Sequence, residues 1–169
     1  MGPTSRVYSP RIVVPMSIAA LILAAGSSSR LGSPKQLLPW GEGPLLQHVI
    51  GQIRSFGLEE IWVVVGHETD AILEQVDFGG ASVVVNDEYA EGIASSMRVG
   101  LDALTRESRA DKVLIAMGDQ PELRPDVVAE LLQLAKREKR PAIVPKYRYT
   151  WSNPVIIDRS LWARLMSLE

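Results

Sequence analysis

The sequence contains no cysteine and only two histidines, and these shortages narrow the chemistry that the chain can perform. Without cysteine there is no disulfide, no thiolate metal ligand and no catalytic thiol. The cysteine content therefore does not indicate whether the protein works in a reducing or an oxidising compartment. Two imidazoles are too few for a histidine-rich zinc site. A Mg²⁺ site built from oxygen ligands needs neither residue type and therefore remains available.

The sequence also lacks an excess of positive charge and a long hydrophobic run. Lysine and arginine number 18 against 20 aspartates and glutamates, which gives a net charge of -2. Such a chain has no general field that attracts nucleic acid, so any phosphate binding must be local. The apolar run 18–25 is too short to cross a bilayer, and its flank is too weakly positive for a signal peptide. We therefore expect a soluble cytoplasmic protein with no nucleic-acid or membrane partner.

The length of 169 residues and the hydrophobic content of 46% fit one domain with a single core. Residues 1–15 contain three prolines, and an internal Met16 opens the first strand pattern, so translation could start at Met1 or at Met16. We expect residues 1–15 to form a disordered or loosely attached tail and residues 16–169 to form the folded domain.

Apolar runs rich in β-branched residues alternate with amphipathic segments along the chain. The runs predict strands at residues 18–24, 61–66, 82–86, 112–117 and 142–145. The amphipathic segments predict helices at residues 45–56, 69–75, 93–105 and 125–139, with a short helix around Trp162. This alternation predicts an α/β fold whose mostly parallel sheet is covered on both faces. Ligands of such folds bind beyond the carboxyl ends of the strands.

The loop after the first predicted strand has the composition of a phosphate-binding loop. Its small residues let backbone N–H groups approach a ligand, its hydroxyl groups add donors, and Arg30 and Lys35 supply positive charge. The spacing matches neither the dinucleotide-binding glycine motif nor the P-loop, because Gly32 is followed by Ser-Pro-Lys. A flexible surface loop is the alternative, but the position after the first strand and the two cations favour phosphate binding.

From Leu21 to Trp40 the chain reads LILAAGSSSRLGSPKQLLPW, which resembles the signature of the MobA-like NTP transferases, in particular the molybdenum cofactor cytidylyltransferases. The resemblance implies a three-layer α/β/α fold with a Rossmann-like sheet of the nucleotide-diphospho-sugar transferase type. It implies catalytic roles for Arg30 and Lys35. The loop residues that would contact the nucleotide are Leu23, Ala24, Ala25, Gly26, Ser27, Ser28, Ser29, Arg30 and Lys35.

A carboxylate follows the fourth predicted strand, in the run Gly118-Asp119-Gln120-Pro121. Asp119 would lie at the same edge of the sheet as the first loop, where it could hold a Mg²⁺ ion that bridges phosphate oxygens. A turn carboxylate is the alternative, since aspartate before Gln-Pro also suits a tight turn. The run resembles the metal-binding segment of the family, which implies a catalytic and metal-binding Asp119.

Two further segments follow strands and carry candidate ligand contacts. Asn86 offers a donor and an acceptor, and Ser95 lies near the start of a helix, although helix capping explains these residues equally well. The segment resembles the stretch of the family that lines its pocket, which implies nucleotide contacts for Asn86, Gly92 and Ser95. Resemblance around the Asn-Pro element likewise implies that Gln120 and Asn153 contact the acceptor.

Aromatic and histidine side chains near these segments have two interpretations each. Tyr147, Tyr149 and Trp151 could stack on a pterin, or they could simply pack on an edge strand. His48 and His67 could act as general bases, but nucleotidyl transfer depends mainly on positioning and charge neutralisation. We therefore interpret both histidines as structural or peripheral.

The relatives generally continue with a GDxG element and a terminal helix, so the chain resembles a C-terminally shortened member. Either water, substrate or another subunit completes the site, or the protein binds nucleotide without transfer. Apolar surface left by a missing helix would also favour a homo-oligomer.

We expect transfer of a nucleoside monophosphate from an NTP to a phosphorylated acceptor such as molybdopterin, with release of pyrophosphate. CTP is favoured because Ala24-Ala25-Gly26 stands where the guanylyl branch has Ala-Gly-Gly. A sugar-1-phosphate or another small acceptor is the alternative within the enzyme class, and a non-catalytic nucleotide-binding or assembly protein is the alternative outside it.

Overall fold

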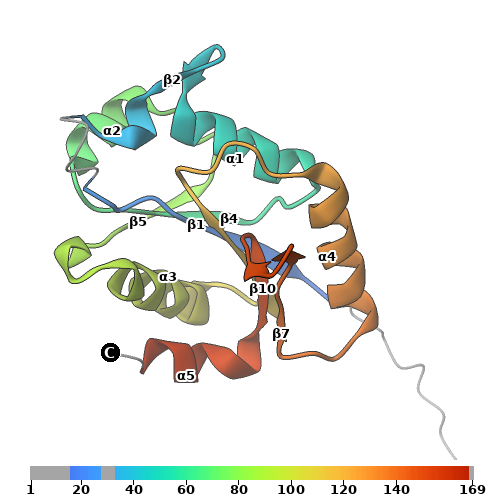
Figure 1. The fold of residues 1–169 in the computed structure, drawn as a ribbon. Helices are drawn as coiled ribbons and strands as arrows, with labels where there is room; N and C mark the ends of the chain where they lie inside the picture. The colour runs from blue at the N-terminus through green and yellow to red at the C-terminus, as the bar shows by residue number, and fades with distance from the viewer. Residues whose placement is uncertain (1–15, 28–32, 168–169) are drawn as a thin grey trace, which may run out of the picture.

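The computed structural model describes residues 16–27 and 33–167, and these residues form three layers (Figure 1). A six-stranded sheet lies in the middle, with helices on both faces. This confirms the predicted three-layer α/β/α architecture. The expected tail at residues 1–15 lies outside the described residues.

The central sheet has the strand order β5-β4-β1-β6-β10-β7. Its four parallel strands are β1 (Ile18–Leu23), β4 (Ile61–Val65), β5 (Ser82–Val85) and β6 (Lys112–Met117). Both β1 and β4 are covered by helices on the two faces, which explains why they read as continuous apolar runs. The sheet is completed by β10 (Val155–Asp158), antiparallel to β6, and by β7 (Ala142–Ile143), antiparallel to β10.

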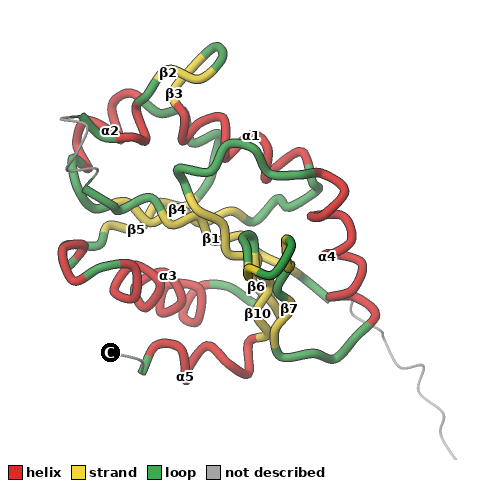
Figure 2. Tube along the Cα trace, viewed as in Figure 1, coloured by secondary structure: helices red, strands yellow, loops and turns green. Residues whose placement is uncertain are grey.

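The helices bury their apolar stripes in two separate cores, one on each face of the sheet. One core receives side chains from α1 (Leu45–Ser55), α2 (Thr69–Gln75) and α4 (Pro125–Arg137). The other receives side chains from α3 (Ile93–Glu107) and α5 (Trp162–Met166). In Figure 2 the strands run between these two groups of helices. Within the described parts of the chain, no helix is both long enough and apolar enough to cross a membrane.

Two small hairpins stand outside the central sheet. The first pairs β2 (Pro39–Trp40) with β3 (Gly43–Pro44), and the second pairs β8 (Lys146–Tyr147) with β9 (Thr150–Trp151). The described residues also form short 3-10 helices at Lys35–Leu37, Tyr89–Glu91 and Arg159–Leu161. The first hairpin connects the 3-10 helix that carries Lys35 to α1, so it lies close to the predicted site.

The sequence predictions place the parallel strands and all the longer helices correctly, with ends that differ by one or two residues. The strand predicted at residues 142–145 is shorter, because only Ala142 and Ile143 pair with β10. The antiparallel strand β10 and both hairpins were missed. Each of these strands is only two to four residues long, which is too short for a repeating pattern to emerge.

Candidate active site

The register of two neighbouring strands brings the first loop and Asp119 to one edge of the sheet. Leu23 at the end of β1 is paired with Met117 at the end of β6, and the Gly118 N–H donates to the Leu23 carbonyl at 2.8 Å. A Cβ at Gly118 would lie 2.7 Å from the Cβ of Ala24. Only glycine therefore allows the residue before Asp119 to pack so closely against the first loop.

Lys35 reaches Asp119 from the 3-10 helix that follows the first loop. Its Nζ lies 3.5 Å from Oδ2 of Asp119, and the two side chains are 43% and 41% exposed. An ion pair this exposed contributes little to folding stability, because water and salt screen it. The pair is better explained by the ligand that this cation and this carboxylate would share.

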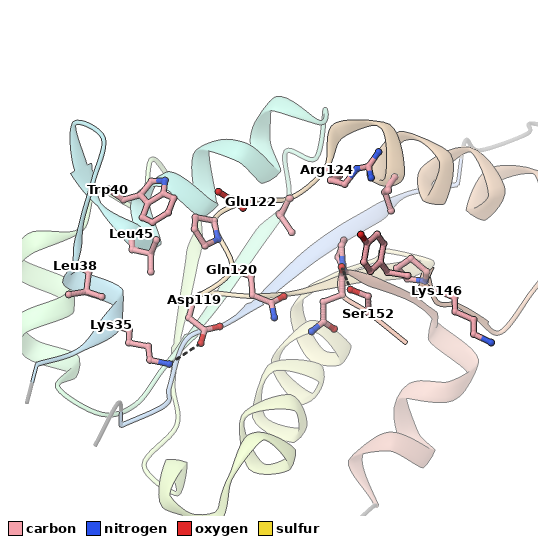
Figure 3. A pocket seen from close by; sticks show the side chains of 17 residues that line it. Lys35, Leu38, Trp40, Leu45, Asp119, Gln120, Glu122, Arg124, Lys146 and Ser152 are labelled. Atoms are coloured by element: carbon pink, nitrogen blue, oxygen red, sulfur yellow. Dashed lines mark hydrogen bonds and ion pairs between the residues drawn. The ribbon is translucent and has the colours of Figure 1, made fainter. Parts of the chain in front are cut away.

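Two hollows meet at the Lys35–Asp119 pair. The larger one is a cleft of about 800 Å³, and Figure 3 shows its side chains, with Leu38 and Trp40 on one side and Arg124 and Lys146 on the other. The smaller one, of about 130 Å³, lies against the end of β1. It is lined by Leu23, Ala24, Gly26, Lys35, Gln36, Met117 and Asp119. Because Lys35 and Asp119 line both hollows, a ligand in either one would reach the same charged pair.

The first loop is described only in part. Ala24 and Gly26 line the smaller hollow, Ala25 is buried, and Ser27 is exposed. The predicted contacts Ser28, Ser29 and Arg30 lie outside the described residues.

The predicted acceptor contacts Gln120 and Asn153 both line the larger cleft. Beside them, Arg124 forms hydrogen bonds with Asp126 at 3.1 and 2.5 Å. This hydrogen bonding raises the pKa of the Arg124 guanidinium and lowers the pKa of the Asp126 carboxyl. The Asp126 carboxylate therefore offsets the positive charge that Arg124 places at the wall of the cleft.

The aromatic residues of the second hairpin divide between the cleft and the solvent. Tyr147 lines the larger cleft, whereas Tyr149 and Trp151 are 92% and 69% exposed and are not among its lining residues. Lys146 lies over both exposed rings, with Nζ 5.9 Å from the centroid of Tyr149 and 5.4 Å from that of Trp151. Of the three rings that could stack on a pterin, Tyr147 has the most suitable position.

Asn86 and Ser95 lie beneath the surface rather than at it. Asn86 is 1% exposed, and its Nδ2 donates to the hydroxyls of Ser95 and Ser96 at 2.9 and 3.0 Å. Its Oδ1 accepts from the Glu88 N–H, and the Ser95 hydroxyl is bonded within the same turn. The predicted nucleotide contacts remain predictions. The geometry favours an indirect role, in which this network holds the turn that ends at Gly92.

Neither histidine lines either hollow. The His48 ring lies on α1, 6.2 Å from the ring of Trp40, and His67 Nδ1 lies 3.4 Å from the hydroxyl of Tyr89. These positions agree with the interpretation of both as structural or peripheral.

Several cleft residues were missed by the sequence analysis: Gln36, Leu38, Trp40, Leu45, Glu122, Arg124, Lys146 and Ser152. The signature run itself contains Gln36, Leu38 and Trp40, so their closeness to Lys35 was an available signal. The others come from α1, the loop before α4 and the second hairpin, and only the folded chain brings them together.

A metal at this site would depend mainly on Asp119. Residues 16–27 and 33–167 contain no cluster of three or more carboxylate or histidine side chains that could enclose a metal ion. One exposed carboxylate suits Mg²⁺, which usually keeps several waters and binds through one or two carboxylates plus substrate phosphates.

The fold and this edge of the sheet define a class of protein. A mostly parallel α/β domain that places a small-residue loop, a lysine and a carboxylate together is a nucleotide-binding domain. Residues 20–169 match the model of the MobA-like NTP transferase domain, and the chain belongs to that family.

Individual curated proteins are also similar to the chain in sequence. The bifunctional protein GlmU of Pseudomonas syringae is 37% identical over 120 residues, which cover 70% of this chain and 25% of that protein. The chain thus spans about a quarter of the length of this relative. The molybdenum cofactor cytidylyltransferase of Escherichia coli is 26% identical over 144 residues, which cover 85% of this chain and 71% of that protein.

Solved structures confirm the fold. The crystal structure of Rv0371c from Mycobacterium tuberculosis is similar with a TM-score of 0.81 and 29% identity, over 92% of this chain and 78% of that one. The same protein in complex with manganese is similar with a TM-score of 0.76 and 27% identity, over 90% of this chain and 77% of that one.

Proposed function

We propose that the chain is a Mg²⁺-dependent nucleotidyltransferase. It would move a nucleoside monophosphate from an NTP, with CTP favoured, to a phosphorylated acceptor such as molybdopterin, and release pyrophosphate. The observation that carries this proposal is the Lys35–Asp119 pair, which lines both a small hollow at the first loop and a large cleft beside it. Transfer between two substrates needs such a junction.

The smaller hollow would take the phosphate end of the NTP. Its wall is the end of β1, where Ala24 and Gly26 carry no long side chain that would keep phosphate oxygens from the backbone. Lys35 adds a positive charge at the same wall. Preorganised donors of this kind stabilise the charge that develops on the phosphates during transfer.

Asp119 would hold Mg²⁺ together with the phosphates of the NTP. This fits the exposed carboxylate beside Lys35, and it is consistent with the manganese complex of the Mycobacterium tuberculosis protein. When bound, the ion would offset phosphate charge and polarise the α-phosphate.

The reaction itself needs positioning more than acid or base chemistry. A phosphate oxygen of the acceptor forms a bond to the α-phosphorus, and the bond from that phosphorus to the bridging oxygen breaks, so pyrophosphate leaves with the electron pair. Lys35 would compensate the negative charge on the departing oxygens. The cleft would hold the acceptor phosphate in line, which accounts for much of the rate gain in such reactions.

CTP is the favoured nucleotide for two reasons. The first loop has Ala24-Ala25-Gly26 rather than Ala-Gly-Gly, and a relative that aligns with 85% of the chain is named a molybdenum cofactor cytidylyltransferase. Both observations support cytidylyl transfer.

The larger cleft favours an acceptor with a ring or another apolar body over a polyol. Leu38, Trp40, Leu45, Leu123 and Val127 line it, together with three prolines. Polar and charged side chains line it as well, and they include Gln120 and Asn153. Apolar walls with a few placed polar groups are typical of small-molecule sites.

The test is a substrate panel with pyrophosphate detection. Each of four NTPs is paired with molybdopterin and with a sugar 1-phosphate, in the presence of Mg²⁺, for the unmodified protein and Asp119→Ala. We expect release with CTP and molybdopterin, lost by a factor of about 10³ or more in the variant. Asp102→Ala, which removes an exposed carboxylate on α3, is the control and should retain full activity.

Two results would contradict the proposal. Pyrophosphate release that survives in Asp119→Ala would remove the role of the carboxylate. NTP binding without release in every pairing would instead support a non-catalytic nucleotide-binding protein.

A further inference from the structure

Gln36 ties its own 3-10 helix to the first loop, although the sequence analysis gave this residue no role. The side chain is 4% exposed, and its Nε2 donates to the carbonyl of Ala24 at 2.5 Å and to that of Gly26 at 3.2 Å. Lys35 is the preceding residue of the same 3-10 helix. The side-chain amide of Gln36 therefore holds the 3-10 helix that carries Lys35 against two peptide groups of the first loop.

The backbone carbonyls from Leu23 to Gly26 all accept hydrogen bonds. The Leu23 carbonyl accepts from the Gly118 N–H, and the Ala25 carbonyl accepts from the His67 N–H at 3.2 Å. Gln36 engages the two that alternate with them. With its acceptors occupied, the backbone from Leu23 to Gly26 offers a ligand mainly donors, which suits an anion.

The peptide geometry then fixes where two of those donors point. In a trans peptide the carbonyl of one residue and the N–H of the next point in opposite directions. The carbonyls of Ala24 and Gly26 face Gln36, so the N–H groups of Ala25 and Ser27 face away from it. Within the described residues, neither N–H donates to a backbone carbonyl.

We propose that Gln36 is a positioning residue for the NTP: it holds the backbone of Ala24 and Gly26 at the wall of the smaller hollow, where the phosphates would bind, and it fixes Lys35 beside them. This inference rests on the proposed function. Stability alone does not explain the side chain, because its Oε1 is buried with no hydrogen-bond partner in the described chain. An unpaired buried acceptor lowers stability, and such groups call for an explanation outside folding.

The variant that tests this proposal is Gln36→Met, which keeps a flexible side chain of similar size but removes both donors. The matched control is Gln52→Met on α1, because the Oε1 of Gln52 is also buried without a partner there. Three quantities are measured for both variants: the affinity for Mg²⁺ and CTP by calorimetry, steady-state kinetics, and the thermal unfolding midpoint.

For Gln36→Met we expect kcat/KM for CTP to fall by about 100-fold, as expected when positioning groups move by about 1 Å. The KM for the acceptor should stay close to that of Gln52→Met. A residue that only supports the fold would shift the midpoint and leave the CTP affinity of the folded protein unchanged. That result, or equal loss of CTP affinity in both variants, would overturn the proposal.

A measurement without nucleotide separates this proposal from the proposed function. Amide NMR signals of Ala25, Gly26 and Ser27 should shift in Gln36→Met and not in Gln52→Met. If they shift while the unmodified protein binds no NTP, the proposed function fails and the loop-positioning role of Gln36 stands. If they do not shift, the positioning role is wrong whatever the protein binds.

Discussion

The ammonium of Lys35 lies 3.5 Å from the Oδ2 of Asp119, at the point where the two hollows meet. A divalent cation on Asp119 would compete with this ammonium for the same carboxylate. Binding of Mg²⁺ with an NTP would therefore exchange the partner of Lys35, from the carboxylate to the phosphates. Under the proposed function, the pair would mark both the metal position and the phosphate position.

Replacing Lys35 by methionine should change metal binding and NTP use in opposite directions. Loss of the charge that faces the phosphates should lower kcat/KM for the NTP by about 10²- to 10³-fold. Loss of the competing ammonium should tighten Mn²⁺ binding to the nucleotide-free protein by up to about fivefold, equivalent to the ~1 kcal/mol limit for an exposed pair. Pyrophosphate release and a Mn²⁺ titration followed by electron paramagnetic resonance measure the two effects.

The control for this experiment is Lys146→Met. Lys146 is another cation of the larger cleft, and its ammonium lies over the rings of Tyr149 and Trp151. This substitution should leave Mn²⁺ binding unchanged. Weaker Mn²⁺ binding in Lys35→Met would show that the lysine supports the metal site rather than competing with it.

Gly118→Ala should disturb the site by moving Asp119 at the end of β6 away from the first loop. The added Cβ would meet the Ala24 Cβ at 2.7 Å and the Leu23 carbonyl at 3.3 Å, so the end of β6 must move away from the first loop. We expect pyrophosphate release to fall by about 100-fold, and the free energy of unfolding to fall by about 1–3 kcal/mol. Kinetics and urea unfolding measure these changes.

Gly51→Ala provides the contrast within the same protein. Gly51 lies inside α1, and an added Cβ there meets nothing within 4 Å. This change should raise stability by about 0.5–1 kcal/mol and leave activity unchanged. Full activity in Gly118→Ala would mean that close packing of the two strand ends is not needed for transfer.

The buried network around Asn86 should act on the nucleotide indirectly, through the turn that ends at Gly92. Asn86→Ala removes the amide that donates to the buried hydroxyls of Ser95 and Ser96. The free energy of unfolding, measured in urea, should fall by about 1–3 kcal/mol. CTP affinity should also fall, and the losses in Asn86→Ala and Ser95→Ala should not add. A coupling of about 0.5–3 kcal/mol in the double variant is expected for residues of one network. Strictly additive losses of affinity would favour two independent ligand contacts.

The regular part of the fold was predictable because each element carries its own pattern. β1 and β4 are buried on both faces and read as unbroken apolar runs, while α4 begins at Pro125, a residue preset for a first helical turn. The antiparallel strand β10 was not predictable in this way. Its four residues acquire a partner only when the chain returns to β6, and local sequence does not encode that pairing.

The site was predictable where the strand-end rule applies and not elsewhere. Lys35 and Asp119 could be brought together because both follow strands that prove to be neighbours in a parallel sheet. The burial of Asn86 could not be foreseen, since a strand-end asparagine looks the same in sequence whether its amide faces a ligand or two serines. Tertiary packing decides between these cases.

The stability of the protein should depend on pH through an ion pair far from the site. Lys112, whose side chain is 3% exposed, lies with Nζ 2.9 Å from Oδ2 of Asp158. Burial tends to raise the pKa of Asp158, but hydrogen bonds from Lys112 and Ser160 outweigh it and lower the pKa below its usual value. The folded state thus binds fewer protons than the unfolded chain. The stabilisation is present above the unfolded pKa of about 4 and is lost as pH falls through the lower folded value.

Two variants of this pair should behave differently in urea unfolding. Lys112→Met should flatten the loss of stability below about pH 4, because the carboxyl no longer has its cationic partner. At pH 7, Asp158→Asn should lower the free energy of unfolding more than Lys112→Met does. The loss should be about 3–5 kcal/mol, because the substitution leaves a buried ammonium without a counter-charge. The exposed pair of Asp102 and Arg106 supplies the control, since Asp102→Asn should change stability by less than about 0.5 kcal/mol. An unchanged acid profile in Lys112→Met would contradict the assignment to this pair.

Trp40 should affect the acceptor and not the nucleotide, because it lines the larger cleft and not the smaller hollow. Its indole is partly exposed on the first hairpin and forms part of the apolar wall seen in Figure 3. Trp40→Ala removes that contact surface and should raise the acceptor KM by about tenfold, equivalent to ~1.4 kcal/mol of lost binding, with the KM for CTP unchanged. Trp151→Ala, a more exposed tryptophan outside the cleft lining, should change neither value. If Trp40→Ala instead raises the KM for CTP, the nucleotide occupies the larger cleft, and the proposed division between the two hollows must be reversed.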